Sequence, residues 1–295
     1  MGMKVNFARI FRRLAEQHGD APALINCERE RSYRFRELHL LTNRIANVLR
    51  DDLGLGKGDR YLLILENDNL ALLHLWTILK GEASAVFTNV RDPLEEHLRM
   101  AEFITPKVVL IEAGMAARYA PALLALGIKV VVLDTPAEPV PGTYDFWALV
   151  NAAADTEPDV ELDCHTHHPL YRFTGGTTGT PKGVMLSHDN VISNIKAVNP
   201  MLPLDSEKRV LSFLPLCHIF ERTVCFVYIL NGVSIYYAES MDTIAENLKE
   251  VKPHFFTSVP RLLEKVYMKL EAASANLESF KKKLYFAAME FANNY

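Results

Sequence analysis

The apolar positions of this chain recur with two different spacings. Over residues 35–50 they return every three or four positions, which predicts an amphipathic helix with one buried face. The same spacing predicts a helix that begins near Phe7 and ends near Gly19, with Phe7, Ile10, Phe11 and Leu14 on one face. Residues 60–65 and 84–88 are short apolar runs instead, and these predict buried strands. Helices and strands are therefore expected in the same domain.

The alternation of the two patterns continues toward the C-terminus. A hairpin-like pair is predicted at 23–26 and 31–34, and further strands at 107–111, 129–133, 209–213, 232–237 and 253–258. Further helices are predicted at 71–80, after Pro93, at 144–154, from 191 onward behind the polar capping residues 188–190, at 243–251 and at 259–267. Strands that alternate with helices are typical of parallel sheets covered by helices. The sequence therefore predicts an α/β fold of layered, parallel-rich sheets flanked by helices.

The segment 135–168 interrupts this alternation with several prolines and acidic residues. We expect it to join two α/β lobes, residues 1–168 and residues 169–295. Cys164 and the histidines that follow it in this segment could suggest a metal site. No second ligand cluster follows at the spacing of a zinc finger, so solvated linker histidines are the favoured interpretation.

Composition narrows the function classes. The chain has 295 residues, long enough for about two domains, and its 49% apolar and 23% charged residues are ordinary for a globular protein. A net charge of −4 gives no electrostatic reason to expect a nucleic-acid partner. Four cysteines without a pairing pattern fit a reducing compartment, and the basic N-terminus does not resemble a signal peptide. No apolar run approaches the roughly 20 residues that span a bilayer, so we expect a cytoplasmic protein whose membrane contact, if any, is peripheral.

Residues 173–188, FTGGTTGTPKGVMLSH, hold the candidate chemistry. Glycines let the backbone approach a ligand closely with its amides pointing inward. Threonine hydroxyls add short donors, and Lys182 adds a positive charge on a flexible stem. This combination suits a polyphosphate. The expected phosphate contacts are Thr174, Gly175, Gly176, Thr177, Thr178, Gly179, Thr180, Lys182 and Gly183.

Two common phosphate motifs do not match this loop. A Walker A motif ends in Gly-Lys-Ser or Gly-Lys-Thr, whereas here Pro181 precedes Lys182 and Gly183 follows it. No Gly-x-Gly-x-x-Gly spacing opens a helix within a strand–helix–strand unit, which excludes a dinucleotide-binding fingerprint. The remaining simple alternative is a surface turn rich in glycine and threonine.

The loop resembles the phosphate-binding signature of the AMP-forming adenylating enzymes, the superfamily of acyl-CoA synthetases, luciferases and peptide-synthetase adenylation domains. That signature is an aromatic residue, Thr-Ser-Gly-Thr-Thr-Gly, any residue, and then Pro-Lys-Gly-Val. The matching positions are Phe173, Thr174, Gly176, Thr177, Thr178, Gly179, Pro181, Lys182, Gly183 and Val184. The chain departs at Gly175, where the family commonly has serine or threonine. The segment 32–67 likewise resembles the opening of the first subdomain in these enzymes.

Residues 214–222, LPLCHIFER, resemble a second family motif, Leu-Pro-Leu-x-His-x-Phe-Glu, found in acyl-CoA synthetases and particularly in those for long chains. The resemblance implies that His218 lies beside the carboxylate or the acyl channel, near the reacting phosphate. An imidazole in that place can orient or neutralise a carboxylate. Glu221 lies one helical turn away and could hold the imidazole, although a purely structural role stays open.

The resemblance implies a two-step activation of a long-chain fatty acid, with ATP and coenzyme A as co-substrates and Mg²⁺ as the metal. A carboxylate oxygen attacks the α-phosphorus of ATP to give an acyl adenylate and pyrophosphate, and a thiol then displaces AMP. The positive charge of Lys182 and the loop donors are expected to stabilise the pyrophosphate. The candidate catalytic residues are His218 and Lys182, the candidate substrate residues are His218 and Glu221, and the candidate Mg²⁺ ligands are Thr174 and Thr177.

The C-terminal part continues the resemblance but does not contain every family motif. Residues 252–267, KPHFFTSVPRLLEKVY, look like the corresponding stretch of long-chain acyl-CoA synthetases. Phe255 and Phe256 are expected in the core, and Arg261 is either a surface charge or a site residue. The family's Tyr-Gly-x-Thr-Glu and Thr-Gly-Asp segments, its hinge and its C-terminal lysine do not follow Lys182 in this chain. We therefore expect the incomplete large N-terminal domain of an acyl-adenylating enzyme, inactive alone.

Two alternative functions stay open. One is an adenylating enzyme for another carboxylate, such as an aryl or amino acid, or one that passes its acyl group to a carrier protein. The other belongs to a different class, a non-catalytic nucleotide-binding domain or scaffold that retains the loop. The sequence carries no signal for acyl chain length or oligomeric state. Carboxylate-dependent pyrophosphate exchange would separate these functions.

Overall fold

The computed structural model describes residues 3–27, 31–74, 77–174, 182–240, 242–264, 267–268 and 290. Contacts divide the chain into two compact units, Met1–Phe256 and Thr257–Tyr295. The first unit contains both large sheets, the helices that cover them and the candidate substrate cavity. In the second unit, residues 260–264 are helical and the side chain of Arg261 is exposed, so both interpretations of Arg261 stay open.

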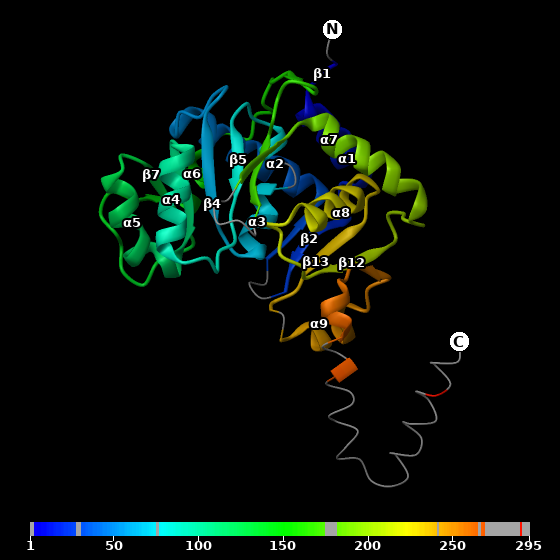
Figure 1. Ribbon diagram of the computed structural model, residues 1–295. Coiled ribbons are helices and arrows are strands. Elements are labelled where there is room, and N and C mark those ends of the chain that lie inside the picture. The colour runs from blue at the N-terminus through cyan, green and yellow to red at the C-terminus, as the bar shows by residue number, and fades with distance from the viewer. Residues whose placement is uncertain are drawn as a thin grey trace. The chain divides into compact units, whose positions relative to one another are not determined.

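Within the described residues, the larger sheet has seven strands in the order β11-β10-β5-β4-β6-β7-β8 (Figure 1). They are β4 (Arg60–Ile64), β5 (Ser84–Phe87), β6 (Val108–Glu112), β7 (Lys129–Leu133), β8 (Tyr144–Asp145), β10 (Leu170–Thr174) and β11 (Lys182–Leu186). Neighbouring strands are parallel except β10 and β11, which form an antiparallel hairpin. The strands β4 to β7 are buried along most of their length, and burial of both faces of the sheet explains their continuous apolar sequences.

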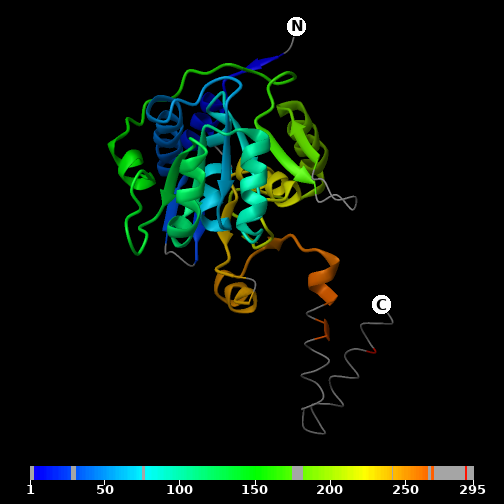
Figure 2. The ribbon, with the colours of Figure 1, turned by 60° about the vertical axis from the view of Figure 1, so that its left-hand side comes forward.

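Alternate residues of this sheet pack into two separate cores. Leu62 belongs to a core completed by α4 (Leu94–Ile104) and α5 (Ala116–Ala125), which lie side by side over one face of the sheet (Figure 2). Leu63 points the opposite way, into a larger core that includes α2 (Phe35–Asn47). Because side chains alternate along a strand, one apolar run supplies both cores.

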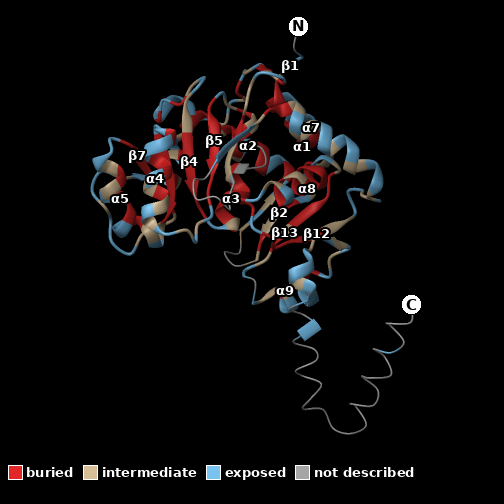
Figure 3. Ribbon diagram, in the orientation of Figure 1, coloured by how far each residue is buried: buried red, intermediate tan, exposed pale blue. Residues whose placement is uncertain are grey.

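The smaller sheet has five strands among the described residues, in the order β14-β12-β13-β2-β3. They are β2 (Pro22–Asn26), β3 (Arg31–Arg34), β12 (Arg209–Ser212), β13 (Ser234–Tyr237) and β14 (Phe255–Phe256). The parallel strands β12 and β13 are connected through α8 (Ile219–Leu230), which also packs into the larger core. This core therefore runs from one sheet to the other, and Figure 3 shows the strands of both sheets among the most buried parts of the chain.

Strands from both sides of residue 168 contribute to each sheet. In the larger sheet β10 pairs with β5, and in the smaller sheet β2 pairs with β13. A third pair, β1 (Lys4–Val5) with β9 (Leu162–Asp163), ties the N-terminus to the segment before the glycine-rich loop. The sheets do not divide at the expected lobe boundary, and the division into residues 1–168 and 169–295 stays a prediction.

The predicted fold class, an α/β fold with parallel-rich sheets covered by helices, is confirmed. The helix predicted at 71–80 is wrong in its bounds, because α3 spans Asn67–His74 and a separate 3-10 turn spans Thr77–Leu79. The hydroxyl of Thr77 donates to the carbonyl of Leu72 at 3.0 Å. Such local side-chain bonds offer the backbone an alternative to a continued helix.

Two expected core positions are exposed. Ile10 of α1 (Phe7–His18) is 37% exposed, because the buried face of that helix is narrower than its apolar spacing suggests. Phe256 is 46% exposed, whereas its neighbour Phe255 packs against the core. β14 is the edge strand of its sheet and has a neighbouring strand on one side only, so its side chains are less covered than those of a central strand.

The helix after the glycine-rich loop begins earlier than expected. α7 spans His188–Val198, and its N-cap is Ser187, which lies before the polar residues 188–190. The Ser187 hydroxyl accepts from the backbone N–H of Asn190, and the Asn190 side chain accepts from the backbone N–H of Ser187. This reciprocal capping box fixes the point at which the chain turns from β11 into α7.

Candidate active site

The carboxyl ends of parallel strands from both sheets border one cavity of about 320 Å³. Glu66 follows β4, Asn89 follows β5, Phe213 and Cys217 follow β12, and Ala238 follows β13. Ligands of open α/β sheets bind in crevices outside the carboxyl ends of the strands. This cavity is therefore the candidate substrate site among the described residues.

The glycine-rich loop leaves the larger sheet at the same edge. β10 runs parallel to β5, so its last residue, Thr174, lies at the carboxyl edge. Thr174 is opposite Lys182 in the β10–β11 hairpin, and residues 175–181 connect these two positions. The predicted contacts Gly175, Gly176, Thr177, Thr178, Gly179 and Thr180 lie outside the described residues.

Lys182 and Gly183 begin the returning strand β11 and are both exposed. Gly183 is opposite Phe173 in the hairpin, and a Cβ atom at Gly183 would meet the Phe173 ring only at 3.9 Å. A side chain would therefore be tolerated at Gly183 on steric grounds alone. The roles predicted for Thr174, Lys182 and Gly183 toward a phosphate stay predictions.

The structure brings the second sequence motif against the strand that enters this loop. His218 is the N-cap residue of α8, and its Nδ1 contacts the Nη2 atom of Arg172 in β10. Because a guanidinium only donates, Nδ1 accepts and the imidazole proton lies on Nε2. Burial lowers the pKa of His218, and the positive charges of Arg172 and Arg222 lower it further. The imidazole is therefore neutral near pH 7.

A second arginine stands behind this histidine. Arg222 lies one turn further along α8, is fully buried, and places its guanidinium 3.7 Å from the centroid of the Phe87 ring. Phe87 is also the register partner of Arg172 in the neighbouring strand. Burial lowers the pKa of Arg222 to about 9, with a smaller contribution in the same direction from Arg172.

Sequence reasoning did not identify Arg172 or Arg222 as site residues. One available signal was Arg172 itself, a charged residue inside the strand LYRFT between two aromatic residues. An arginine in such a strand must either reach solvent or meet a polar partner. For Arg222 the sequence held no comparable signal, because an arginine in an amphipathic helix is ordinarily exposed.

Glu221 is positioned by the sheet. Its carboxylate accepts a hydrogen bond from the hydroxyl of Ser212, the last residue of β12, at 2.6 Å, and the side chain is 1% exposed. This geometry favours the structural alternative for Glu221. Its predicted role toward the substrate stays a prediction.

The histidines before the loop have specific partners. His167 Nδ1 lies 2.9 Å from His188 Nε2, His167 Nε2 lies 2.9 Å from the carbonyl of Glu82, and the two imidazoles are stacked. His165 is exposed, and its Nδ1 lies 3.4 Å from Oδ2 of the partly exposed Asp189. In the described part of the chain no group of three or more His, Cys, Asp or Glu side chains could hold a metal ion. The interpretation as solvated linker histidines therefore applies to His165 and not to His167.

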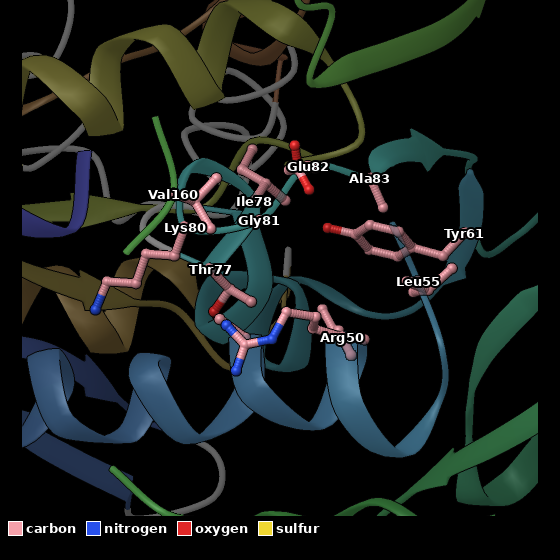
Figure 4. Close-up of a pocket in the computed structure, with 12 residues that line it drawn as sticks. Arg50, Leu55, Tyr61, Thr77, Ile78, Lys80, Gly81, Glu82, Ala83 and Val160 are labelled. Carbon is pink, nitrogen blue, oxygen red and sulfur yellow. The ribbon is translucent and has the colours of Figure 1, made fainter. Parts of the chain in front are cut away.

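A smaller cavity next to α2 is not a candidate substrate site. Its volume of about 30 Å³ is enough for only about two water molecules. Figure 4 shows Tyr61, Arg50 and Glu82 around it, with the side chain of Lys80 running away from Tyr61. The Lys80 ammonium group instead donates to Asn43 Oδ1 at 2.6 Å, within a buried polar cluster.

A family model described as AMP-binding enzyme matches residues 11–291. The chain belongs to this family. It is 34% identical over 274 residues to long chain acyl-CoA synthetase 3 of Arabidopsis thaliana, covering 87% of this chain and 41% of that protein. It is 30% identical over 257 residues to 4-coumarate–CoA ligase 3 of Oryza sativa subsp. japonica, covering 85% and 45%. The chain thus spans less than half the length of these curated relatives.

The fold has close counterparts among solved structures. A long-chain-fatty-acid–CoA ligase from Archaeoglobus fulgidus superposes with a TM-score of 0.78 over 92% of this chain and 55% of that protein, at 21% identity. A likeness at this identity concerns the fold alone. The family match confirms the predicted family, and this likeness confirms the predicted fold. Among the described residues no helix is long and apolar enough to cross a membrane.

Proposed function

We propose that this chain carries the phosphate-binding and carboxylate-binding part of an AMP-forming long-chain fatty-acid–CoA ligase. The observation that carries the proposal is the contact of Arg172 with His218. It joins the strand that enters the glycine-rich loop to the LPLCHIFER motif, beside the cavity at the carboxyl ends of β4, β5, β12 and β13. The names of the long-chain relatives support fatty acids as the substrate class.

The proposed reaction activates the acid in two steps. A carboxylate oxygen of the fatty acid bonds to the α-phosphorus of ATP, and the bond to the β-phosphate oxygen breaks to release pyrophosphate. The sulfur of coenzyme A then bonds to the acyl carbon, and AMP leaves with the electron pair of the broken C–O bond. In the first step His218, with its proton on Nε2, donates toward the carboxylate and orients it.

Charge stabilisation in the first step is assigned to the loop. Lys182 and the loop threonines would stabilise the charge that develops on pyrophosphate by fixed donors and a cation. Mg²⁺ would neutralise further phosphate charge, and Thr174 and Thr177 are its proposed ligands. The length of the chain, less than half that of its curated relatives, supports the proposal that it is inactive alone.

The proposed function also includes a cellular compartment and a set of binding partners. Cys27, Cys164, Cys217 and Cys225 are free thiols, which supports a reducing compartment such as the cytoplasm. Fatty acids partition into membranes, so peripheral membrane contact is compatible with the proposed substrate. ATP, coenzyme A and a fatty acid are the proposed small-molecule partners, and no nucleic acid is expected.

Pyrophosphate release tests the proposed function. This chain is incubated with ATP, Mg²⁺, dodecanoate and coenzyme A, next to a longer chain that continues into a Tyr-Gly-x-Thr-Glu segment. We expect pyrophosphate and dodecanoyl-CoA from the longer chain and neither from this chain. Product from this chain alone would overturn the assignment as an inactive part, and no product from either would overturn the ligase function.

The second candidate function is activation of another carboxylate, and the rice relative favours it by its name, 4-coumarate–CoA ligase. Carboxylate-dependent exchange of pyrophosphate into ATP decides between the acids when the longer chain is offered dodecanoate and 4-coumarate separately. Exchange with dodecanoate alone supports the fatty-acid assignment, and exchange with 4-coumarate alone supports the second candidate. Exchange with neither acid would favour the non-catalytic nucleotide-binding alternative.

A further inference from the structure

Arg222 is a buried cation whose side chain has no hydrogen-bonding partner among the residues that the structure describes. Its side chain is 0% exposed, and its Nε, Nη1 and Nη2 atoms donate no hydrogen bond within the described part of the chain. The contact that holds it is the face of the Phe87 ring, 3.7 Å from the guanidinium carbon. A cation over an aromatic face is stabilised only modestly, whereas an unpaired buried charge is costly. Among the described residues the charge of Arg222 is therefore compensated only weakly.

A second positive charge faces the same place. Arg172 is the register partner of Phe87, so the side chains of both residues lie on one face of the larger sheet. The guanidinium of Arg172 contacts His218, and His218 is the N-cap of α8, the helix that carries Arg222. The N-terminus of a helix adds partial positive charge at that end. The contact between Arg172 and His218, with Arg222 one turn further along α8, therefore brings two guanidinium groups and an imidazole together next to Cys217, which lines the cavity.

We propose that Arg172 and Arg222 form, with His218, an anion subsite for the carboxylate of the acyl substrate. The inference rests on the proposed function and adds two residues to it. Arg172, which is only half-buried, donates to the carboxylate directly. Arg222 is a positioning residue, because it holds positive potential behind Phe87, one helical turn from His218.

The walls of the cavity favour a carboxylate over a polyphosphate as the ligand. Glu66, Asp68 and Glu239 line it, and Arg91 is the basic side chain among its lining residues. Apolar lining from Leu65, Leu70, Val90, Phe213 and Pro215 suits the hydrocarbon part of an acid. The subsite is therefore assigned to the acid, whereas ATP phosphates are assigned to the loop.

Paired ligands test this assignment. Binding of dodecanoate and of the neutral dodecanol to this chain is measured by equilibrium dialysis for the wild type, Arg172→Gln, Arg222→Met and Arg222→Lys. We expect about tenfold weaker dodecanoate binding for Arg172→Gln and Arg222→Met, with dodecanol unchanged, because only the carboxylate loses a charge partner. Arg222→Lys keeps the charge and should recover part of the affinity. Arg118→Gln, which removes an exposed arginine over the ring of Tyr119, is the matched control.

Thermal unfolding without ligand separates this role from a structural one. We expect Arg222→Met to melt at the same or a higher temperature than the wild type, because the substitution removes an uncompensated buried charge. A lower melting temperature with an unchanged dodecanoate-to-dodecanol ratio would overturn the inference and make Arg222 a packing residue.

The remaining outcomes distinguish the inference from the proposed function. If the wild type binds dodecanoate and all variants bind it equally well, the inference fails and the ligase function stands. If the variants weaken the binding of pyrophosphate and leave dodecanoate unchanged, the anion is a phosphate and the carboxylate assignment is overturned. If the wild type binds neither dodecanoate nor dodecanol, the fatty-acid function of this chain fails first.

Discussion

At the scale of single residues, His167 and His188 form a neutral pair whose proton positions follow from their partners. The carbonyl of Glu82 can only accept, so His167 Nε2 carries a proton and His167 Nδ1 accepts from His188 Nε2. Burial lowers the pKa of both imidazoles, that of His188 to about 3. A second proton on His167 would occupy Nδ1, the atom that accepts from His188. The pair therefore joins the segment before the loop to the start of α7 only when it is neutral.

This pair makes the stability of the fold depend on pH. The pKa of His188 is depressed on folding, so the unfolded chain binds more protons below about pH 6.5, and stability is lost as the pH falls from there toward 3. For one such histidine, the loss between pH 7.5 and 5 is about 2 kcal/mol. His39, whose pKa is also lowered to about 3, acts in the same window, so a comparison of variants is needed. Urea unfolding at both pH values should show the wild type losing about 2 kcal/mol more than His188→Gln.

The exposed His165 on the same segment supplies the control. His165→Gln is the matched control for replacing a histidine of this segment, because its side chain is exposed and, among the described residues, makes no contact with the pair of His167 and His188. An unfolding free energy of His188→Gln that falls with pH as steeply as in the wild type would contradict the assignment to His188.

The buried hydrogen bond between Ser212 and Glu221 is a second interaction of single residues that contributes to stability. Ser212→Ala leaves a carboxylate oxygen of Glu221 without this 2.6 Å hydrogen bond, and we expect the free energy of unfolding to fall by about 1–3 kcal/mol. If Glu221 is structural, dodecanoate affinity stays at the wild-type value. Ser193→Ala removes a hydroxyl from the exposed face of α7 and serves as the control, with no expected effect above about 0.5 kcal/mol. A large loss of dodecanoate affinity with unchanged stability would instead restore the substrate role of Glu221.

At the scale of elements, the capping box of α7 fixes the helix start next to the glycine-rich hairpin. Ser187→Ala removes the side-chain acceptor of the Asn190 N–H and should destabilise the protein by about 1 kcal/mol in urea unfolding. Asn190→Ala removes the reciprocal bond. Because both bonds belong to one motif, the double variant should lose less than the sum of the single variants. Strict additivity would show that the two bonds act independently.

The accuracy of prediction from sequence differs among the elements of this fold. Long apolar runs such as residues 60–65 predicted buried strands correctly, because burial on both faces leaves no room for polar residues. β11 was not predicted, since its residues are exposed and its pairing with β10 depends on the loop between them. Burial of Arg222 was not predicted either, because it depends on Phe87, a residue of a distant strand. Local pattern therefore specifies elements, whereas edge pairing and buried charges depend on contacts far apart in the chain.

At the scale of the whole molecule, the order of the strands determines which parts of the chain can fold alone. The strand β13, which also pairs with β12, pairs with β2 across almost the whole length of the first unit, and β10 lies beside β5. A chain of residues 1–168 would keep β2 and β3 but lose their neighbours in the smaller sheet, and the larger core would lose α8. Two strands without a packed neighbour are only marginally stable in water.

Truncated chains test this dependence. We expect residues 1–168 to show no cooperative thermal transition by circular dichroism, because the apolar face shared by the two sheets stays open. Residues 1–256, which form the first compact unit, should keep the transition of the full chain, because that unit includes both sheets. The matched control is the mixture of residues 1–168 with residues 169–295, which should recover a transition only if the parts associate. Independent cooperative transitions of the two separate parts would instead support the division into two lobes at residue 168, and would mean that the strand pairing across that boundary contributes little to stability.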